Sequence, residues 1–198
     1  MPRPNVEVER KEQILGAACK VIAERGFREL RVADVAREAS LSSGIVHYYF
    51  TDKRNLVRAA FERNFARSLE RRETILESDD DAITRLRALI DAYLPSEAET
   101  VEAWHVWAEL WAEAIHDSDL QELNDHAYGE WRRLVAGIVR DGQAAAQITA
   151  GDAVEIANLL IAVLDGLALQ VLAGSTSMTL TRMRTVCQSF IDRVVLPQ

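Results

Sequence analysis

The sequence predicts an all-α protein of about nine helices. Apolar residues recur at helical spacing along most of the 198 residues, and no segment alternates apolar and polar residues as a half-buried strand does. Apolar residues make up 48% of the chain, which is ample for a packed core. Glycine, proline and capping residues separate the periodic segments, so each segment is expected to form one helix.

The first periodic segment, Arg10–Arg25, has an apolar stripe on one face. Gly26 follows it and is expected to end the helix. Residues 1–9 contain two prolines and are expected to form a disordered tail, although Arg3 within it could reach a DNA minor groove.

Residues 31–50 predict two short helices joined by a tight turn, the arrangement of a helix-turn-helix. The second helix is expected to begin at a cap supplied by Ser42 or Ser43. Val46 and Phe50 lie one turn apart and are expected to face inward, which leaves the polar side chains of this helix exposed. On spacing alone, an ordinary helical hairpin is the stronger interpretation of this stretch.

The N-terminal region resembles the DNA-binding domain of the tetracycline-repressor (TetR) family of bacterial regulators. The resemblance lies in the run Glu12–Gly26 followed by Phe27, in the run Val35–Ala39, and in the run Ser42–Phe50 followed by Lys53 and Leu56. Ser40 and Ile45 stand where the family often has glycine and threonine. The resemblance therefore implies the fold and not the operator sequence.

This resemblance implies two domains, a DNA-binding domain at residues 1–58 with its helix-turn-helix at 31–50, and a ligand-binding and dimerisation domain at residues 59–198. The first 58 residues hold 11 Lys or Arg and 8 Asp or Glu, and the remainder holds 12 and 23. A weakly basic module thus precedes an acidic body. The net charge of −8 is compatible with DNA binding, because phosphate neutralisation needs only local positive charge.

The second helix of such a module enters the major groove of double-stranded DNA. The residues expected to contact DNA are Ser42, Ser43, Gly44, Ile45, His47, Tyr48, Tyr49 and Lys53. Hydrogen bonds to base edges suit Ser43 and His47. A phosphate contact suits Lys53, which matches a lysine of the family.

Further helices are expected downstream of residue 50. They are Lys53–Glu77, residues 79–94, Ala98–His116, Asp117–Ala146, Gly151–Ala173 and Thr179–Val195. Whether the fourth of these breaks near Gly142 is left open. The first contains neither glycine nor proline, so it is expected to run uninterrupted and to transmit a tilt between the domains.

Trp104, Trp107 and Trp111 lie on one face of their predicted helix. Indole is the best partner for a cation–π interaction, so these residues are candidate ligand contacts, with a purely structural role in the core as the open alternative. The opposite face carries carboxylates that are expected to be solvated, namely Glu102, Glu109 and Glu113.

Asp165 interrupts the apolar segment Val154–Ala173. Because a buried carboxylate needs a partner, it is a candidate ligand residue, a dimer contact or a structural group bonded to another helix. The resemblance implies the structural role, since an Asp-Gly pair recurs in the C-terminal halves of the family. We retain Asp165 among the candidate ligand residues.

The body also resembles the branch of the family that contains the choline-responsive repressor of betaine synthesis. The likeness lies in Trp107–Ala114 and His116–Asn124. The predicted function is a ligand-responsive repressor released from a pseudo-palindromic operator by a small molecule, with an activator or a ligand-independent regulator as the alternative. The indoles and the acidic body favour a small cationic amine as effector, with an apolar compound as its rival.

The last two helices are expected to pair with their copies in a homodimer, forming a four-helix bundle, because Val154–Ala173 is apolar around nearly its whole circumference. Its polar residues argue against a membrane span. The polar start of the chain predicts no signal peptide and a cytoplasmic location. Cys19 and Cys187 are expected to be buried thiols.

The histidines lack the spacing of metal ligands, and no catalytic motif is recognisable. We therefore expect no metal, no cofactor and no enzymatic activity, and a helical enzyme is the weak rival interpretation.

Overall fold

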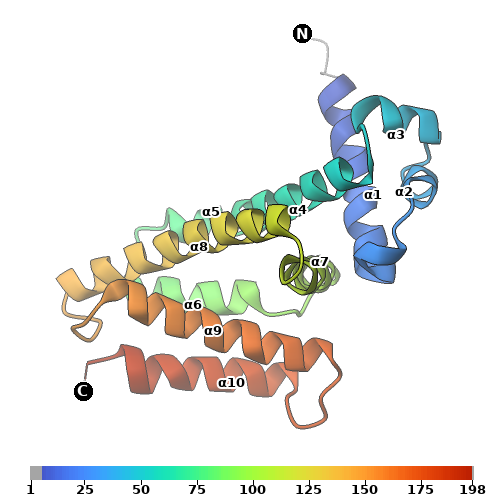
Figure 1. The fold of residues 1–198 in the computed structure, drawn as a ribbon. Helices are drawn as coiled ribbons and strands as arrows, with labels where there is room; N and C mark the ends of the chain where they lie inside the picture. The colour runs from blue at the N-terminus through green and yellow to red at the C-terminus, as the bar shows by residue number, and fades with distance from the viewer. Residues whose placement is uncertain (1–5, 198) are drawn as a thin grey trace. The chain divides into compact units, whose positions relative to one another are not determined.

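The computed structural model describes residues 6–197, and over these residues the chain forms ten α-helices and no strand (Figure 1). The helices are α1 (Val6–Glu29), α2 (Val32–Glu38), α3 (Ser43–Tyr49), α4 (Lys53–Glu70), α5 (Glu73–Leu76), α6 (Ala82–Tyr93), α7 (Ala98–Ala114), α8 (Ser118–Ala144), α9 (Ala153–Leu172) and α10 (Leu180–Phe190), which a π-helical turn (Ile191–Val195) follows. The all-α prediction is confirmed.

The helices form two compact units. Unit 1 holds the chain up to Ser68 together with Glu102–Asn124, and unit 2 holds Leu69–Val101 together with the chain from Asp125. The predicted boundary at residue 58 follows the DNA-binding motif, whereas unit 1 also includes most of α4 and α7.

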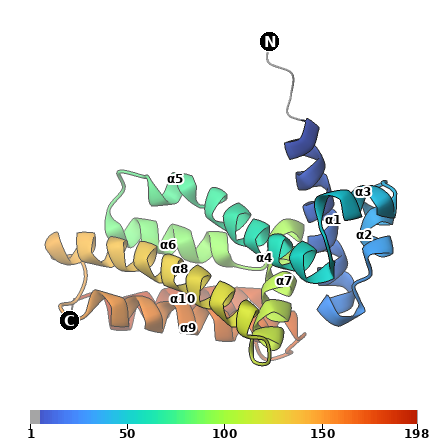
Figure 2. The ribbon, with the colours of Figure 1, turned by 45° about the horizontal axis from the view of Figure 1, so that its top comes forward.

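Unit 1 is organised around one hydrophobic core, to which α1, α2, α3, α4, α7 and the start of α8 contribute. In Figure 2, α2 and α3 lie next to each other beside α1. Fully buried members of this core include Ile14, Leu56, Phe61 and Leu110. Because α7 supplies part of this core, it packs directly against the helices of the DNA-binding motif.

The helix-turn-helix forms as predicted. Ser42 caps α3, since its Oγ accepts a hydrogen bond from the Ile45 N–H at 3.3 Å. Ser40 in the turn has a φ of 54°, a left-handed conformation that favours glycine, and it stands where the family often has glycine. Val46 and Phe50 are buried, which confirms their predicted inward orientation.

The first helix is longer than predicted. It begins at Val6, so Val6–Glu9 are helical and the expectation of a disordered tail is wrong for them. Acidic side chains in this first turn stabilise the positive end of the helix dipole. Gly26 interrupts the helix with φ 81° and ψ 162°, as predicted. Arg3 lies outside the described residues.

The uninterrupted helix predicted over Lys53–Glu77 is wrong in its second half. α4 ends at Glu70, and two turn residues separate it from α5; the second of them, Arg72, has φ −110° and ψ −2°. No glycine or proline causes this break. The Arg72 side chain is buried against aromatic rings of unit 2, and such tertiary contacts override helix propensity. This break accounts for ten helices where nine were predicted.

Unit 2 contains α5, α6, most of α8, α9 and α10. Side-chain caps begin three of these helices: Asp81 for α6, Asp152 for α9 and Thr179 for α10. α8 continues through Gly142 without a break. α9 and α10 lie side by side in both views (Figures 1 and 2).

α9 is the most apolar helix of the described chain, with a mean hydropathy of 1.8. By length and composition it could cross a membrane, although core helices of soluble proteins pass the same test. Leu159 and Leu169 on this helix are 47% and 39% exposed. Part of this apolar helix is thus left uncovered by the described residues.

Two glycines of α8 give a matched test of packing in unit 2. A Cβ at Gly142 would lie 2.5 Å from Ile148 Cδ1 and 2.8 Å from Ala82 Cβ, whereas a Cβ at Gly137 meets nothing within 4 Å. We expect Gly142→Ala to lower the free energy of unfolding by about 1–3 kcal/mol. Gly137→Ala should raise it by about 0.5–1 kcal/mol through helix propensity. Urea denaturation measures both, and equal effects of the two substitutions would contradict the packing described at Gly142.

Candidate functional site

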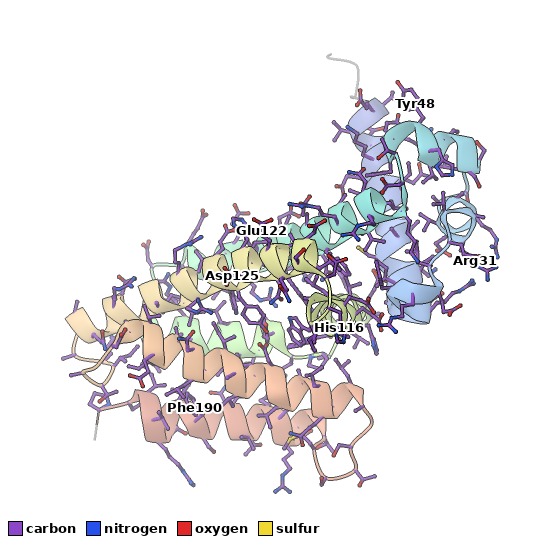
Figure 3. The ribbon with its side chains drawn as sticks, in the orientation of Figure 1. Arg31, Tyr48, His116, Glu122, Asp125 and Phe190 are labelled. Atoms are coloured by element: carbon purple, nitrogen blue, oxygen red, sulfur yellow. The ribbon has the colours of Figure 1, made fainter. Side chains whose placement is uncertain are left out.

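The recognition helix α3 presents a polar and aromatic surface to solvent. Tyr48, which is labelled on α3 in Figure 3, is 82% exposed, and Ile45 is 38% exposed. Ser43 and His47 are also exposed. Tyr49 is half-buried, and its ring meets that of Tyr48 edge-on with centroids 5.0 Å apart. These side chains are available to a ligand as large as a DNA duplex.

Gly44 has no packing role that explains its lack of a side chain. A Cβ there would meet only Ser42 Oγ, at 3.8 Å, which is an ordinary contact, and the residue is helical and exposed. A small residue at this exposed position leaves room for close approach to the helix N-terminus.

Lys53, at the start of α4, is half-buried. Its Nζ donates a hydrogen bond to the Arg28 carbonyl at 3.0 Å and lies 5.0 Å from the centroid of the Phe27 ring. The ammonium therefore ties the start of α4 to the last residues of α1, which follow the kink at Gly26. Its predicted contact with phosphate stays a prediction.

The carboxylates of α7 hold this same segment. Glu109 Oε2 accepts a hydrogen bond from the Phe27 N–H at 2.7 Å, and Glu113 Oε1 lies 2.7 Å from Arg28 Nε. The prediction that these glutamates are solvated is wrong, because α1 and α7 share one core and bring the segment after Gly26 against them. Gly26 accommodates the approach, since a Cβ there would lie 3.1 Å from Glu109 Oε2. Glu102 is half-buried as well.

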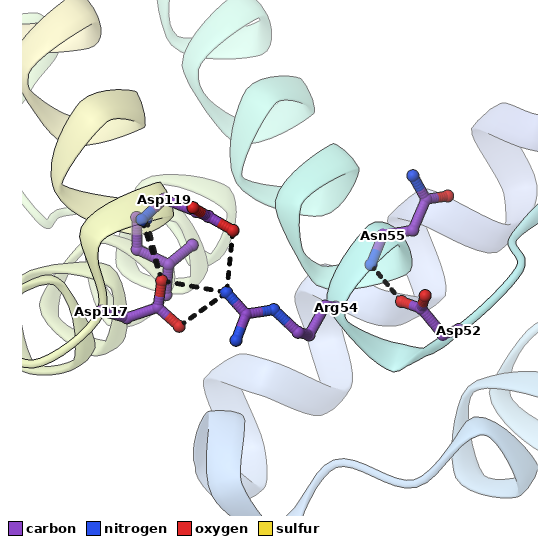
Figure 4. Close-up of polar contacts among 6 residues, drawn as sticks. Asp52, Arg54, Asn55, Asp117 and Asp119 are labelled. Atoms are coloured by element: carbon purple, nitrogen blue, oxygen red, sulfur yellow. Dashed lines mark hydrogen bonds and ion pairs between the residues drawn. The ribbon is translucent and has the colours of Figure 1, made fainter.

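A second charged contact joins the start of α4 to the start of α8 (Figure 4). Arg54 Nη2 lies 3.0 Å from Asp117 Oδ2 and 2.9 Å from Asp119 Oδ2. Asp117 Oδ1 also accepts hydrogen bonds from the backbone N–H groups of Asp119 and Leu120, so Asp117 caps α8 while it binds Arg54. These residues border a groove of about 260 Å³ that also contacts Phe27.

The three tryptophans predicted as ligand contacts belong to unit 1. Trp104 is 4% exposed, while Trp107 and Trp111 are half-buried. The Trp111 ring lies 6.0 Å from that of Trp104 and 6.4 Å from that of Trp107, and Phe65 meets Trp107 edge-on. Trp107 also packs against the core of unit 1. The three indoles thus form one connected aromatic cluster, as their spacing predicted.

Asp165, the fourth predicted ligand residue, belongs to unit 2. Its carboxylate accepts hydrogen bonds from the Tyr93 hydroxyl at 3.0 Å and from the Tyr128 hydroxyl at 2.5 Å. These bonds join α9 to α6 and α8, which is the structural role that the family resemblance implied. Within the described chain, Asp165 forms no ion pair with a Lys, Arg or His side chain.

Burial raises the pKa values of the ionisable groups around Asp165. Desolvation raises the pKa of Asp165 to about 6, against the lowering effect of the bonds from Tyr128 and Tyr93. Burial and the neighbouring Asp165 charge also raise the pKa of both tyrosines, so both stay protonated donors. At pH 7 the site therefore holds a negative charge at a position where burial opposes it.

Aromatic rings and one arginine complete this cluster in unit 2. The Tyr93 and Trp131 rings are parallel within 1° with centroids 5.8 Å apart. The Arg72 guanidinium carbon lies 4.7 Å from the Tyr93 centroid and 5.3 Å from that of Trp131. Trp131 is 7% exposed, and its indole N–H has no hydrogen-bond partner within the described chain.

Sequence reasoning missed most of this cluster. Tyr128 and Trp131 share a face of α8 at i, i+3 spacing, which was a usable signal. Arg72 and Tyr93 carried no signal, since each lies far from Asp165 in the chain. The buried state of Cys19 and Cys187 was predicted and is confirmed, and burial raises the pKa of the Cys19 thiol to about 11.

Comparison with known proteins places these features in a family. Residues 14–60 match the model of bacterial regulatory proteins of the tetR family, and residues 82–196 match the model of the C-terminal region of BetI-type transcriptional repressors. The HTH-type transcriptional regulator BetI of Paraburkholderia phytofirmans is 30% identical, over 98% of both chains. BetI of Proteus mirabilis is 29% identical, over 97% of this chain and 94% of its own.

Solved structures agree. A putative transcriptional regulator from Saccharomonospora viridis, in complex with choline, is 31% identical with a TM-score of 0.90, over 96% of this chain and all of its own. A putative TetR-family regulator from Rhodococcus sp. is 30% identical with a TM-score of 0.84, over 94% and 98%. The chain therefore belongs to the TetR family, with a BetI-type C-terminal region, and is a ligand-responsive, DNA-binding transcriptional regulator.

Proposed function

We propose that the protein is a homodimeric cytoplasmic repressor that leaves a pseudo-palindromic operator when a small quaternary amine binds it. The observation that carries the effector class is the buried Asp165 carboxylate, which two tyrosine hydroxyls hold beside the aromatic rings of unit 2. Each part of this proposal has its own structural support.

DNA contact is assigned to the exposed face of α3 and the start of α4. Ser43, Ile45, His47 and Tyr48 are all exposed there, and the proposal has the side chains of Ser43 and His47 read base edges. Ser42 and Gly44 shape the helix N-terminus, while Tyr49 and Lys53 are assigned to phosphate.

A homodimer is supported by the uncovered apolar surface of unit 2. Leu159 and Leu169 of α9 are exposed, as is Val194 in the turn after α10. Phe190 ends α10 and is half-buried (Figure 3). A second copy that covers these side chains through a two-fold axis would place two recognition helices on one DNA duplex.

A cationic effector is supported by charge and by ring chemistry. A cation beside Asp165 would offset the cost of burying its carboxylate. The faces of Tyr93 and Trp131 attract cations through their quadrupoles, and the unpaired Trp131 N–H can donate to an oxygen atom of the effector. The choline complex of the Saccharomonospora viridis relative makes choline the first compound to test. Trp104, Trp107 and Trp111 remain predicted ligand contacts, to be tested by alanine substitution.

Coupling to DNA is assigned to α7. This helix carries the tryptophan cluster. It also carries Glu109 and Glu113, whose carboxylates hold the last residues of α1, after the kink at Gly26. A shift of α7 would therefore move the DNA-binding helices with it, provided that the effector binds the shifted state more tightly.

The DNA assignment predicts different effects for two substitutions. On a duplex that the wild type selects from random DNA, Lys53→Ala should weaken binding to all sequences alike and flatten the salt slope by about one unit. His47→Ala should instead cost about 1–3 kcal/mol on the preferred sequence and relax the preference. Fluorescence anisotropy over a salt series measures both.

Thermal denaturation controls for the lost hydrogen bond from Lys53 to the Arg28 carbonyl, and light scattering should show a dimer. Wild-type binding by both folded variants would exclude the assigned surface.

The effector assignment predicts a pH dependence. The Asp165 carboxylate is ionised above its pKa of about 6, and only this form attracts a cation. Choline affinity, measured by calorimetry without DNA, should therefore be constant above pH 7 and fall by up to about tenfold per pH unit below 6. Asp165→Asn should bind choline more weakly and without this dependence. Circular dichroism at each pH controls for acid unfolding. A wild-type affinity that does not change between pH 5 and 8 would rule out Asp165 as the partner of the cation.

The coupling assignment predicts unequal effects for the two α7 glutamates. Glu109→Ala leaves the Phe27 N–H without its charged acceptor and should lower the free energy of unfolding by about 1.5–3 kcal/mol. Glu113→Ala removes an ion pair with an exposed arginine and should cost less than about 1 kcal/mol. Choline should also release the operator less completely from Glu109→Ala than from Glu113→Ala. The assignment fails if the two variants are equally stable and release alike.

A further inference from the structure

Arg72 places a protein cation on the same aromatic pair that the proposed effector would use. Its guanidinium carbon is 4.7 Å and 5.3 Å from the ring centroids of Tyr93 and Trp131, within the range of a cation–π interaction. Arg72 is 4% exposed. A fully charged side chain is thus buried in the second unit, at a break in the helices that local sequence does not explain.

Tyr93 links this arginine to the carboxylate. Its ring faces Arg72, while its hydroxyl donates to Asp165 at 3.0 Å. Arg72 and Asp165 form no direct ion pair within the described chain. The cluster therefore contains a cation and an anion that both contact Tyr93 and do not form an ion pair with each other.

Burial makes the position of Arg72 costly. Desolvation lowers the pKa of Arg72 to about 10, which means that the surroundings disfavour its charge. A guanidinium has five N–H donors, and each of them is hydrated when the side chain is in water. A quaternary ammonium has no N–H donors, and its burial on the same rings sacrifices no hydrogen bonds to water. The two cations therefore compete for the same rings, and burial costs each of them a different amount.

The position of Arg72 in the chain gives this exchange a consequence. Arg72 is two residues beyond Glu70, where α4 ends, and α4 begins directly after the helix-turn-helix. α4 has residues in both units. A movement of Arg72 away from the rings would shift the end of α4 and would allow the break at Arg72 to rearrange.

We infer that Arg72 is an internal cation that occupies the effector's aromatic surface in the ligand-free protein, and that a cationic effector must displace it to act. Arg72 is thus a specificity-determining residue. It selects ligands that carry a positive charge able to replace its own, and its displacement transmits binding to α4. This inference rests on the proposed cationic effector and adds to it the residue whose displacement starts the coupling. Residues of α4 and α7 share the core of unit 1, so a movement of α4 acts on the α7 contacts described above.

The test compares Arg72→Met with the matched control Arg71→Met. Arg71 pairs with Glu99 at 3.0 Å, so its substitution removes an adjacent positive charge without removing the cation beside Tyr93 and Trp131. Choline and tetramethylammonium are titrated by calorimetry, with dimethylbutanol as the uncharged isostere of choline. Release of a fluorescent operator duplex, selected by the wild type, is followed in parallel by anisotropy.

Arg72→Met should bind choline about tenfold more tightly than wild type, because the competing cation is gone. Choline should nevertheless change the operator affinity of Arg72→Met by less than about threefold, because this variant has no arginine to displace. By reciprocity, operator DNA should weaken choline binding to the wild type and not to Arg72→Met. Arg71→Met should match the wild type in both assays. Arg72→Lys keeps a charge that stacks less well on rings, so it should bind choline slightly more tightly than wild type.

Circular dichroism establishes that each variant folds, and Arg72→Lys carries the test if Arg72→Met does not fold. Choline binding to the wild type with unchanged or weaker binding to the folded Arg72 variant overturns the role of Arg72 and leaves the cationic effector in place. If choline releases the operator from Arg72→Met as completely as from the wild type, the role of Arg72 is likewise overturned and the cationic effector stays in place. If neither protein binds choline or tetramethylammonium, or if dimethylbutanol binds as well as choline, the cationic effector and the role of Arg72 are both overturned.

Discussion

The burial of charged groups among helices is the constraint on which the second unit depends. The apolar helix α9 can contain the buried Asp165 carboxylate because two hydroxyl groups donate hydrogen bonds to it, from Tyr93 of α6 and from Tyr128 of α8. A carboxylate left without those donors would cost several kcal/mol. The same requirement brings three helices into a defined register, so the polar site and the packing of the unit have one physical origin.

Charge acts differently in the first unit, where it joins elements at the surface of a core. Val106 and Leu110 of α7 are buried in the core of the DNA-binding helices, and this apolar contact supplies most of the association. The carboxylate of Glu109 then fixes the orientation, because it meets a single backbone N–H beyond Gly26. Selected carboxylates of the acidic body are therefore specific partners of the basic module, in addition to the general attraction between opposite charges.

The two units together suggest how a regulator of this family can respond to a small ligand without a large binding energy. A coupling free energy of about 1–3 kcal/mol suffices to change DNA affinity by one or two orders of magnitude. α4 and α7 each have residues in both units. These two helices are the elements on which the proposed coupling depends.

Local sequence alone determined the helical class, most of the caps, the two short helices of residues 31–50 and the aromatic face of α7, because periodicity, capping and turn chemistry act over a few residues. It also identified Asp165 as a polar residue in an apolar helix. The interpretation of residues 31–50 as a DNA-binding helix-turn-helix came from the family resemblance. Tertiary structure decided the break at Arg72, the partners of Asp165 and the contact of Glu109 with the Phe27 N–H, because each depends on residues between 21 and 82 positions away that only packing brings together. A charged residue within an apolar segment can therefore be recognised from the sequence. Its partner, which determines its function, is determined by the fold.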